Sequence, residues 1–337
     1  MNQDFFGFPT GAWTKPQVYV FQQSVKFGWP SSATHISILV IGGGGGGGGG
    51  RKGSATTAYG GGGGCGGFVR YVRRIPFELI TTSGLSPNMN IVIGAGGTAG
   101  SGATTDGSNG GNGGIAGASY VEFFVRRVSG TTENLQQGIY FIYAQGGGAG
   151  LGGTSAASSS TQATVQAASA GAFRGLTGGT SSSGFGGQVI GSYDTNLFGT
   201  HPFIFTSPAG GACGGVKDQI YSNNAITSAI LHTSGLHWDG SAENGIDIQN
   251  KFGRLTDNAP FQYLQAPYLE DLSWWITLPG GGGGAGGDAT TGGKFGGAGY
   301  CGSGGGGGGA TGSTTLNAGA GGVGGRGRVI IWAEKLW

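Results

Sequence analysis

Short apolar runs alternate along this chain with segments of almost pure glycine. The run from Ile36 to Ile41 leads directly into nine consecutive glycines, Gly42 to Gly50. Near the other end the order is reversed, because a glycine-rich stretch leads into the apolar run from Arg328 to Trp332. Runs of about four to eight β-branched and aromatic residues bounded by glycine predict strands. Further runs of this kind occupy residues 17–21, 68–72, 91–93, 120–125 and 139–143.

No segment shows the sustained 3.6-residue period of an amphipathic helix. Residues 216–275 are the one long stretch that is poor in glycine, and they lack this period as well. The sequence therefore predicts an all-β fold with glycine segments threaded through it.

Glycine accounts for 83 of the 337 residues, whereas charged residues make up only 9%. Such a composition can indicate a disordered linker, because it buries little apolar surface to offset the entropy of the chain. Aromatic residues nevertheless reach 11% and cluster in the strand-like runs. We therefore expect an ordered protein.

The glycine runs show a period of three residues. Polyproline II is the regular conformation with three residues per turn, and its peptide groups must bond to water or to neighbouring chains. Collagen shares the period but requires far more proline than the 10 residues present here. We therefore predict a bundle of polyglycine II helices with glycine on the inward faces. The longest triplet series is Gly293, Gly296, Gly299, Gly302, Gly305 and Gly308.

Charge and cysteine content narrow the cellular setting. A net charge of +2 gives no electrostatic reason to expect a nucleic-acid partner, and no apolar run approaches the length of a membrane span. The first residues lack the pattern of a secretory signal, and the three cysteines, Cys65, Cys213 and Cys301, are an odd number without metal-like spacing. We expect synthesis in a reducing cytoplasm without membrane insertion.

Several motifs resemble the glycine-rich domain of bacteriophage tail-fibre and tail-tip proteins. The carrying residues are Phe27-Gly28-Trp29-Pro30 followed by the strand and glycine run from Ser37 to Gly42. The segments Gly66–Val69, Ile91–Gly97 and Gly325–Trp332 are similar to that family's return strand, central element and closing strand. Together these motifs bracket about residues 17–332.

The resemblance implies a jelly-roll or TNF-like β-sandwich joined to a bundle of polyglycine II helices, and by analogy a homotrimer. We divide the chain into an aromatic N-terminal arm with a first strand (1–35) and a single glycine-rich domain (36–337). That domain carries a glycine-poor insertion at about 216–275.

The search for chemistry predicts no catalytic site, no metal site and no cofactor. Glycine-rich sequences match phosphate-loop patterns without being phosphate loops. The best match, Gly293-Lys294-Phe295, lacks the Ser/Thr that would hold Mg²⁺. His232 and His237 lie near Asp239 and Glu243, a conceivable metal or acid–base cluster, although ordinary polar loop residues are the default interpretation.

The insertion also contains candidates for receptor binding. Aromatic rings beside polar side chains are typical of carbohydrate and protein recognition, because they combine a large contact area with a low ordering cost. Packing in the core is the alternative interpretation for such rings. The candidates are Trp238, Asp239, Tyr263 and Tyr268.

These features favour a non-enzymatic virion protein, namely a phage fibre tip or appendage that binds a glycan or an outer-membrane protein of the host surface. The N-terminal arm would contact other virion proteins. The alternative is a structural subunit that decorates a capsid or tail and binds no receptor. An ice-binding protein is a third hypothesis, but the threonines are scattered and do not form a regular flat face.

Overall fold

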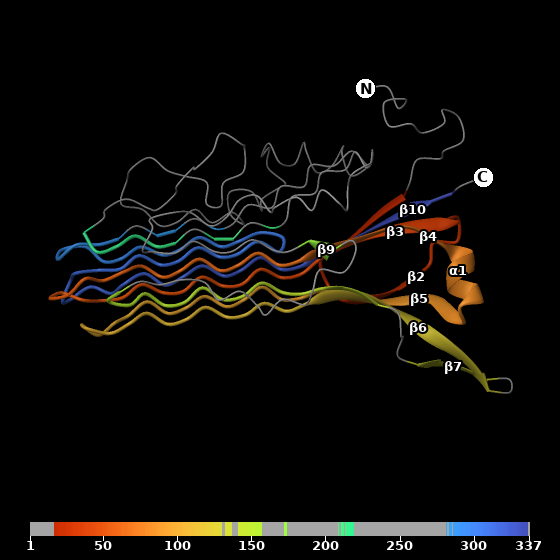
Figure 1. Ribbon diagram of the computed structural model, residues 1–337, viewed down its shortest axis with the longest axis horizontal. Helices are drawn as coiled ribbons and strands as arrows, with labels where there is room; N and C mark the ends of the chain where they lie inside the picture. Colours follow the sequence, from red (N-terminus) through yellow and green to blue (C-terminus); the bar gives the residue numbers. More distant parts are fainter. Residues whose placement is uncertain are drawn as a thin grey trace, which may run out of the picture.

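The structure is a computed structural model (Figure 1). It describes residues 17–129, 132–136, 141–156, 172–173, 208, 210–211, 213–218, 281, 283–284 and 286–335.

Two antiparallel sheets form one end of the molecule, and the predicted all-β class is confirmed. Sheet A has the order β1-β10-β3-β4-β9, and sheet B has the order β2-β5-β6-β7, with β8 also pairing with β6. The strands of sheet A are β1 (Gln17–Phe21), β3 (His35–Ile41), β4 (Val69–Pro76), β9 (Ala172–Phe173) and β10 (Arg328–Glu334). Those of sheet B are β2 (Val25–Gly28), β5 (Leu85–Val92), β6 (Ser119–Ser129), β7 (Thr132–Gln136) and β8 (Phe141–Ala144).

The two sheets share one apolar core. Ile38 and Ile331 of sheet A are fully buried in the same cluster as Met89, Ile91 and Val121 of sheet B. Residues at alternate positions of β3 and β10 enter this cluster, as a strand geometry with a period of two requires. The two sheets therefore form a β-sandwich.

The sequence-based prediction missed four short elements, namely one helix and the strands β2, β7 and β9. The helix α1 (Phe77–Thr82) begins directly after Pro76, whose φ of −76° leads into a helix start. Strand β2 contains the Phe27-Gly28 pair that resembled a turn, and β7 follows β6 as a hairpin. Among the described residues, no helix has the length and apolarity needed to cross a membrane.

The glycine segments continue the strands away from the sandwich and lie side by side (Figure 1). Strands β3, β5 and β8 each run on into such a segment, and β4, β6 and β10 are each entered from one. The segments span 42–53, 59–67, 93–103, 108–118, 145–154, 210–217, 281–287, 292–299, 303–311 and 317–327, of which residues 212, 282 and 285 are not described.

Segment 42–53 lies at the centre of hydrogen bonds that repeat every third residue. The N–H groups of Gly44, Gly47 and Gly50 donate to segment 317–327 at 2.8–2.9 Å. The next residue in each triplet donates to segment 59–67, and the one after that donates to segment 108–118. The three-residue period predicted from the sequence is therefore the period of the hydrogen bonds.

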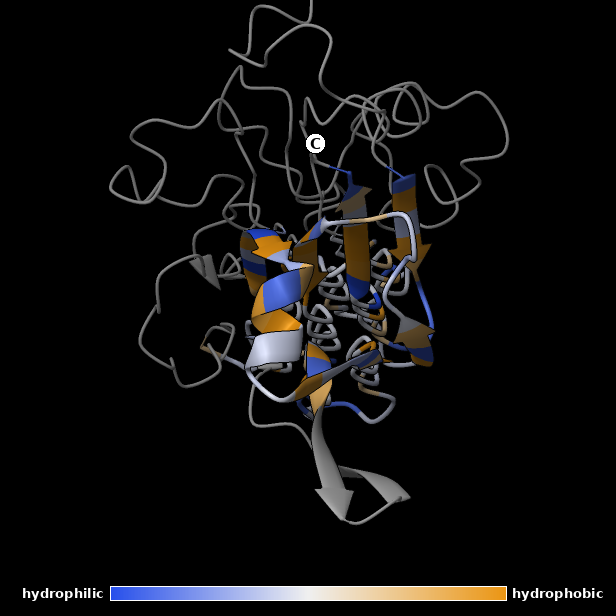
Figure 2. Ribbon diagram, turned by 90° about the vertical axis from the view of Figure 1, so that its right-hand side faces the viewer, coloured by the Kyte–Doolittle hydropathy of each residue, from blue (hydrophilic) through white to orange (hydrophobic). Residues whose placement is uncertain are grey.

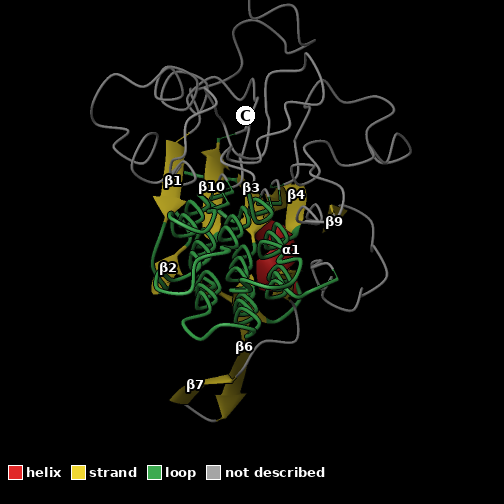
Figure 3. Ribbon diagram, turned by 90° about the vertical axis from the view of Figure 1, so that its left-hand side faces the viewer, coloured by secondary structure: helices red, strands yellow, loops and turns green. Residues whose placement is uncertain are grey.

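The carbonyl groups of the central segment follow the same rule. They accept from three parallel neighbours, and the segment thus has six neighbours in all. Segment 303–311 has six as well, and it contains the second-longest uninterrupted run of glycines, Gly304 to Gly309. The ten segments therefore pack as rows of three, four and three, with these two in the interior (Figure 3).

This packing explains why the interior runs contain glycine alone. A Cβ atom added at Gly44 would lie 1.9 Å from the carbonyl oxygen of Ser303, and one at Gly47 would lie 2.0 Å from that of Gly306. Segment 108–118 lies on the perimeter, and every third position there carries a side chain that is exposed. These outward residues are Asn109, Asn112 and Ile115.

The triplet series from Gly293 to Gly308 does not form one continuous segment. The chain reverses at Cys301 and Gly302, whose φ angles are 43° and 82°, and the N–H of Ser303 donates to Tyr300 O at 3.0 Å. Gly293, Gly296 and Gly299 donate to segment 317–327, whereas Gly305 and Gly308 donate to segment 42–53. The turn was hidden because Gly302 keeps the triplet register.

Candidate recognition tip

The receptor-binding candidates Trp238, Asp239, Tyr263 and Tyr268 lie outside the described residues. The same holds for His232, His237 and Glu243 and for the insertion at 219–275. The hypotheses about these residues stay predictions.

The structure brings together a different set of residues at the end of the glycine bundle that points away from the sandwich. Four loops meet there, each joining a segment that runs outward to one that returns (Figures 1 and 3). We call this surface the tip and define it as residues 53–58, 103–108, 288–291 and 311–317.

Every loop of the tip carries two consecutive threonines. All eight are exposed, and each pair is preceded by alanine or serine. The exposed threonines are Thr56, Thr57, Thr104, Thr105, Thr290, Thr291, Thr314 and Thr315. Threonine hydroxyls both donate and accept hydrogen bonds, so these eight side chains give the tip a hydrogen-bonding surface.

Polar contacts hold two of these loops together. The backbone N–H of Ser54 donates to Asp106 Oδ1 at 2.8 Å, and its hydroxyl donates to Oδ2 at 2.5 Å. Lys217 Nζ donates to Ser54 O at 2.7 Å, and the buried Lys52 donates from Nζ to Thr104 O at 3.0 Å. The ammonium groups of Lys52 and Lys217 therefore donate to carbonyl oxygens at the place where the hydrogen bonds between the glycine segments end. The hydrogen bonds from Ser54 hold the pKa of Asp106 below its usual value.

Asp288 organises a third loop by itself. Its Oδ1 accepts from the backbone N–H groups of Thr290 and Thr291 at 2.7 and 2.8 Å, and from both hydroxyls at 2.9 and 3.0 Å. These hydrogen bonds lower the pKa of Asp288 from 3.8 to about 2. Thr311 donates from its hydroxyl to Thr291 O at 2.8 Å and so connects this loop to the fourth.

We expect the Asp288 loop to keep its structure down to about pH 2. The folded pKa lies below the ordinary value of 3.8, so the stabilisation is present above that value and is lost as the pH falls through about 2. The measurement is an NMR titration of the Thr290 and Thr291 amides, with Asp288→Asn as the control that removes the transition. A midpoint near 4 would contradict the assignment.

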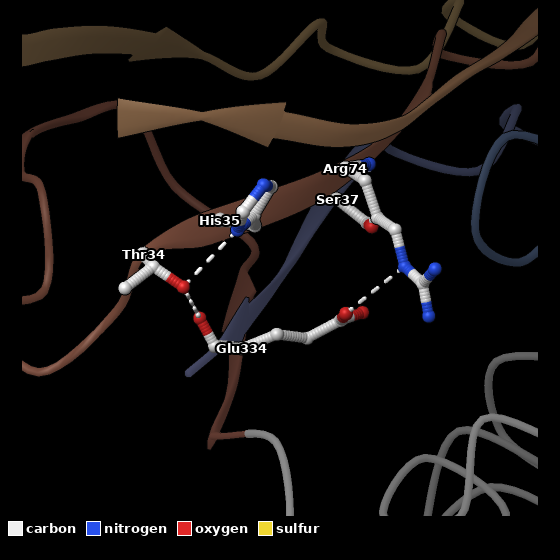
Figure 4. Close-up of polar contacts among 5 residues, drawn as sticks. All are labelled: Thr34, His35, Ser37, Arg74 and Glu334. Carbon is white, nitrogen blue, oxygen red and sulfur yellow. Dashed lines mark hydrogen bonds and ion pairs between the residues drawn. The ribbon is translucent and has the colours of Figure 1, made fainter. Parts of the chain in front are cut away.

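A second polar cluster lies at the opposite end, where β3, β4 and β10 approach one another (Figure 4). Arg74 Nε is 3.3 Å from Glu334 Oε2, and the Arg74 N–H donates to Ser37 Oγ at 3.0 Å. His35 Nδ1 is 3.0 Å from Thr34 Oγ1. Arg74 has a φ of 49°, beside the register shift in the pairing of β3 with β4. These contacts hold the ends of β3, β4 and β10 together, which accounts for the cluster.

The junction between sandwich and bundle contains a buried cation. Arg328 Nη2 donates to Tyr300 Oη at 2.9 Å, and the guanidinium carbon lies 5.2 Å from the centre of that ring. Cys301 is buried beside them, and burial raises the pKa of its thiol. Cys65 and Cys213 are also buried. This environment keeps Cys301 as a packing residue.

With this architecture established, comparison with known families gives one result. A family model described as a glycine-rich domain matches residues 21–334, which is most of the chain. The protein belongs to this glycine-rich domain family. The match begins at the last residue of β1 and ends at the last residue of β10, so the sandwich and the bundle both belong to the glycine-rich domain. No curated protein matches the chain well enough to count as a relative.

A sequence signal for the tip was present but was not used. Each threonine pair falls between two glycine runs, and three of them follow alanine: Ala55, Ala103 and Ala289. Scattered along the sequence, these threonines showed no regular face. The bundle brings them together because all four of these loops connect segments at the same end of the bundle.

Proposed function

We propose that this glycine-rich domain is a non-enzymatic structural protein of a virion, a fibre tip or appendage that binds the host cell surface through its tip. The resemblance of Phe27–Pro30 and the strand–glycine junctions to phage tail-fibre proteins motivates the virion assignment. The observation that carries the proposal is the packing of segment 42–53 against six neighbours, which makes a stiff support for the loops.

The hydrogen bonds between segments make the bundle stiff. We expect the segments to be polyglycine II helices, because that conformation leaves the N–H and C=O groups to bond to neighbouring segments. Side chains cannot separate the interior segments, and their N–H and C=O groups are shared among neighbours in several directions. Bending the bundle would break hydrogen bonds to more than one neighbour at once. A rigid scaffold that presents loops is a common way to build a binding site.

The chemistry of the tip fits a polar ligand such as a glycan of the host surface. Its threonines are exposed, while Asp106 and Asp288 are already engaged by hydroxyl and amide donors within the tip. The ordered carboxylates thus fix the loop backbones. Asp288 accepts the hydroxyls of Thr290 and Thr291, so the threonines left for contacts lie in the other loops, such as Thr57 and Thr105. The alternative of a decorating subunit without a receptor would leave this surface without a ligand.

The test is binding of the full-length protein to an array of bacterial surface polysaccharides and to outer-membrane vesicles. We expect binding to at least one of these probes, and a loss of about tenfold or more in the double variant Thr57→Arg, Thr105→Arg, because two bulky cations would occupy the contact surface.

Thr98→Arg is the matched control, since Thr98 is an exposed threonine on the side of the bundle. It should bind like the unaltered protein. Absence of binding to every probe would count against a receptor-binding function and favour the decorating subunit. Equal loss in the control and the tip variant would exclude the tip as the site.

A further inference from the structure

Strand β1 forms one edge of sheet A. It pairs with β10 on one side, and on its other side no described strand pairs with it (Figures 2 and 3). Its sequence is Gln-Val-Tyr-Val-Phe, which has no charge, no proline and no glycine. An edge of this kind exposes backbone N–H and C=O groups that can pair with another strand.

Two of the other described edges carry features that discourage pairing. Strand β9 is only two residues long, and β2 includes the exposed Lys26 and ends at Gly28. Very short strands, lysines and glycines are recognised ways of protecting a sheet edge. The uncharged β1 therefore differs from β9 and β2.

Apolar side chains surround this edge. Val20 of β1 is 41% exposed, and Val25 of the neighbouring edge strand β2 is 42% exposed. The two strands lie on the same side of the sandwich, because the ring centroid of Phe27 is 4.9 Å from that of Tyr19 and 5.0 Å from that of Phe21. A strand that pairs with β1 would lie beside Val20.

We propose that β1 pairs antiparallel with β1 of a second copy of this chain across a two-fold axis. The strand complements itself when the axis passes through Tyr19, because all five residues then pair and Val18 lies opposite Val20 of the partner. No like charges oppose each other in this register, and apolar β-branched pairs stabilise a sheet. The contact is isologous and closes at two copies.

This register satisfies the open edge whichever alternate residues of β1 point their peptide groups outward. If the peptide groups of Val18 and Val20 point outward, Val18 of each copy exchanges hydrogen bonds with Val20 of the other. If the peptide groups of Gln17, Tyr19 and Phe21 point outward, Tyr19 pairs with Tyr19 of the other copy, and Gln17 of each copy pairs with Phe21 of the other. The two copies of sheet A would then form one continuous sheet. The proposal does not depend on receptor binding.

The test is sedimentation velocity of the full-length protein over a range of concentrations. We expect a monomer–dimer equilibrium, and in Val20→Lys a dissociation constant raised by roughly tenfold or more, since two new cations would lie diagonally across the axis. The matched control is Val323→Lys, because Val323 is 43% exposed on the glycine bundle. It should dimerise like the unaltered protein.

Hydrogen exchange of the unaltered protein supplies a measurement that needs no variant. Protection of the β1 amides should fall on dilution, while protection of the central β3 amides should not change. A monomer at every concentration would overturn the proposal, and so would a homotrimer without a dimer. Equal behaviour of the two lysine variants, or β1 protection that does not depend on concentration, would also overturn it.

Discussion

Replacing Gly47 with alanine is expected to destabilise the protein by roughly 3–5 kcal/mol, although the change adds a single methyl group. The new Cβ would lie 2.0 Å from Gly306 O and 2.5 Å from its carbonyl carbon. Both atoms belong to the backbone of the other interior segment, which has neighbours on every side and cannot rotate away. The two segments would have to separate, and the hydrogen bonds on both would lengthen or break.

Gly53→Ala is the matched control for this variant. Gly53 is the last residue of the same segment, but the atoms nearest to an added Cβ would be the side-chain atoms Thr56 Oγ1 at 3.0 Å and Arg51 Nε at 3.4 Å. These side chains can move, so the expected change is within about 0.5–1 kcal/mol. The measurement is the free energy of unfolding from denaturant titrations. Similar values for the two variants would contradict the six-neighbour packing.

The sequence carried this packing in the lengths of its uninterrupted glycine runs. A perimeter segment needs glycine only at positions that face a neighbour, so outward residues such as Asn112 and Val323 interrupt it. A segment with six neighbours has no outward position. The two longest pure runs, Gly42–Gly50 and Gly304–Gly309, are accordingly the two interior segments. Run length therefore predicts position in the bundle, whereas the triplet period alone does not.

The neighbours of each segment in the bundle could not be predicted from its glycine-rich sequence. Every run offers the same chemistry, so only the connections select neighbours. The reversal at Cys301–Gly302 shows the difficulty, because it preserves the triplet and leaves no proline or asparagine to mark a turn. Strand β5 was predicted only at its end, because only Ile91 to Ile93 showed a strand-like pattern. The register shift between Leu85 and Met89 lets Pro87 lie within this strand.

The candidate site shows the same limit. Its chemistry is visible in the sequence as repeated threonine pairs, but the pairs are far apart along the chain. They form a surface only after the segments have been aligned side by side. The aromatic insertion drew attention because it interrupts the glycine, and its residues lie outside the described part of the structure.

Leu39→Ala should destabilise the protein by about 2–5 kcal/mol, as much as a substitution between the two sheets. Leu39 points to the face of sheet A that is opposite the shared core, and it is only 1% exposed. It packs in a second cluster with Ile41, Val69, Cys301, Ile330 and Trp332. Truncation would leave a cavity among these side chains, and the lost burial adds to the cost of the cavity.

Leu79→Ala provides the same chemical change at an exposed position. Leu79 lies on α1 and is 53% exposed, so its truncation should change the free energy of unfolding by less than about 1 kcal/mol. Denaturant titrations of the two variants give the comparison directly. Equal small effects would show that the outer face of sheet A is not a core.

The second cluster explains why β3 is apolar at nearly every position. A strand covered on one face alternates apolar and polar residues, whereas Ile36–Ile41 has the single polar residue Ser37. Ser37 lies on the outer face, and its hydroxyl accepts the N–H of Arg74. Cys301, from the turn that reverses the glycine chain, packs on that face beside Leu39. The Leu39 variant therefore also tests whether the bundle is anchored to the sandwich through this turn.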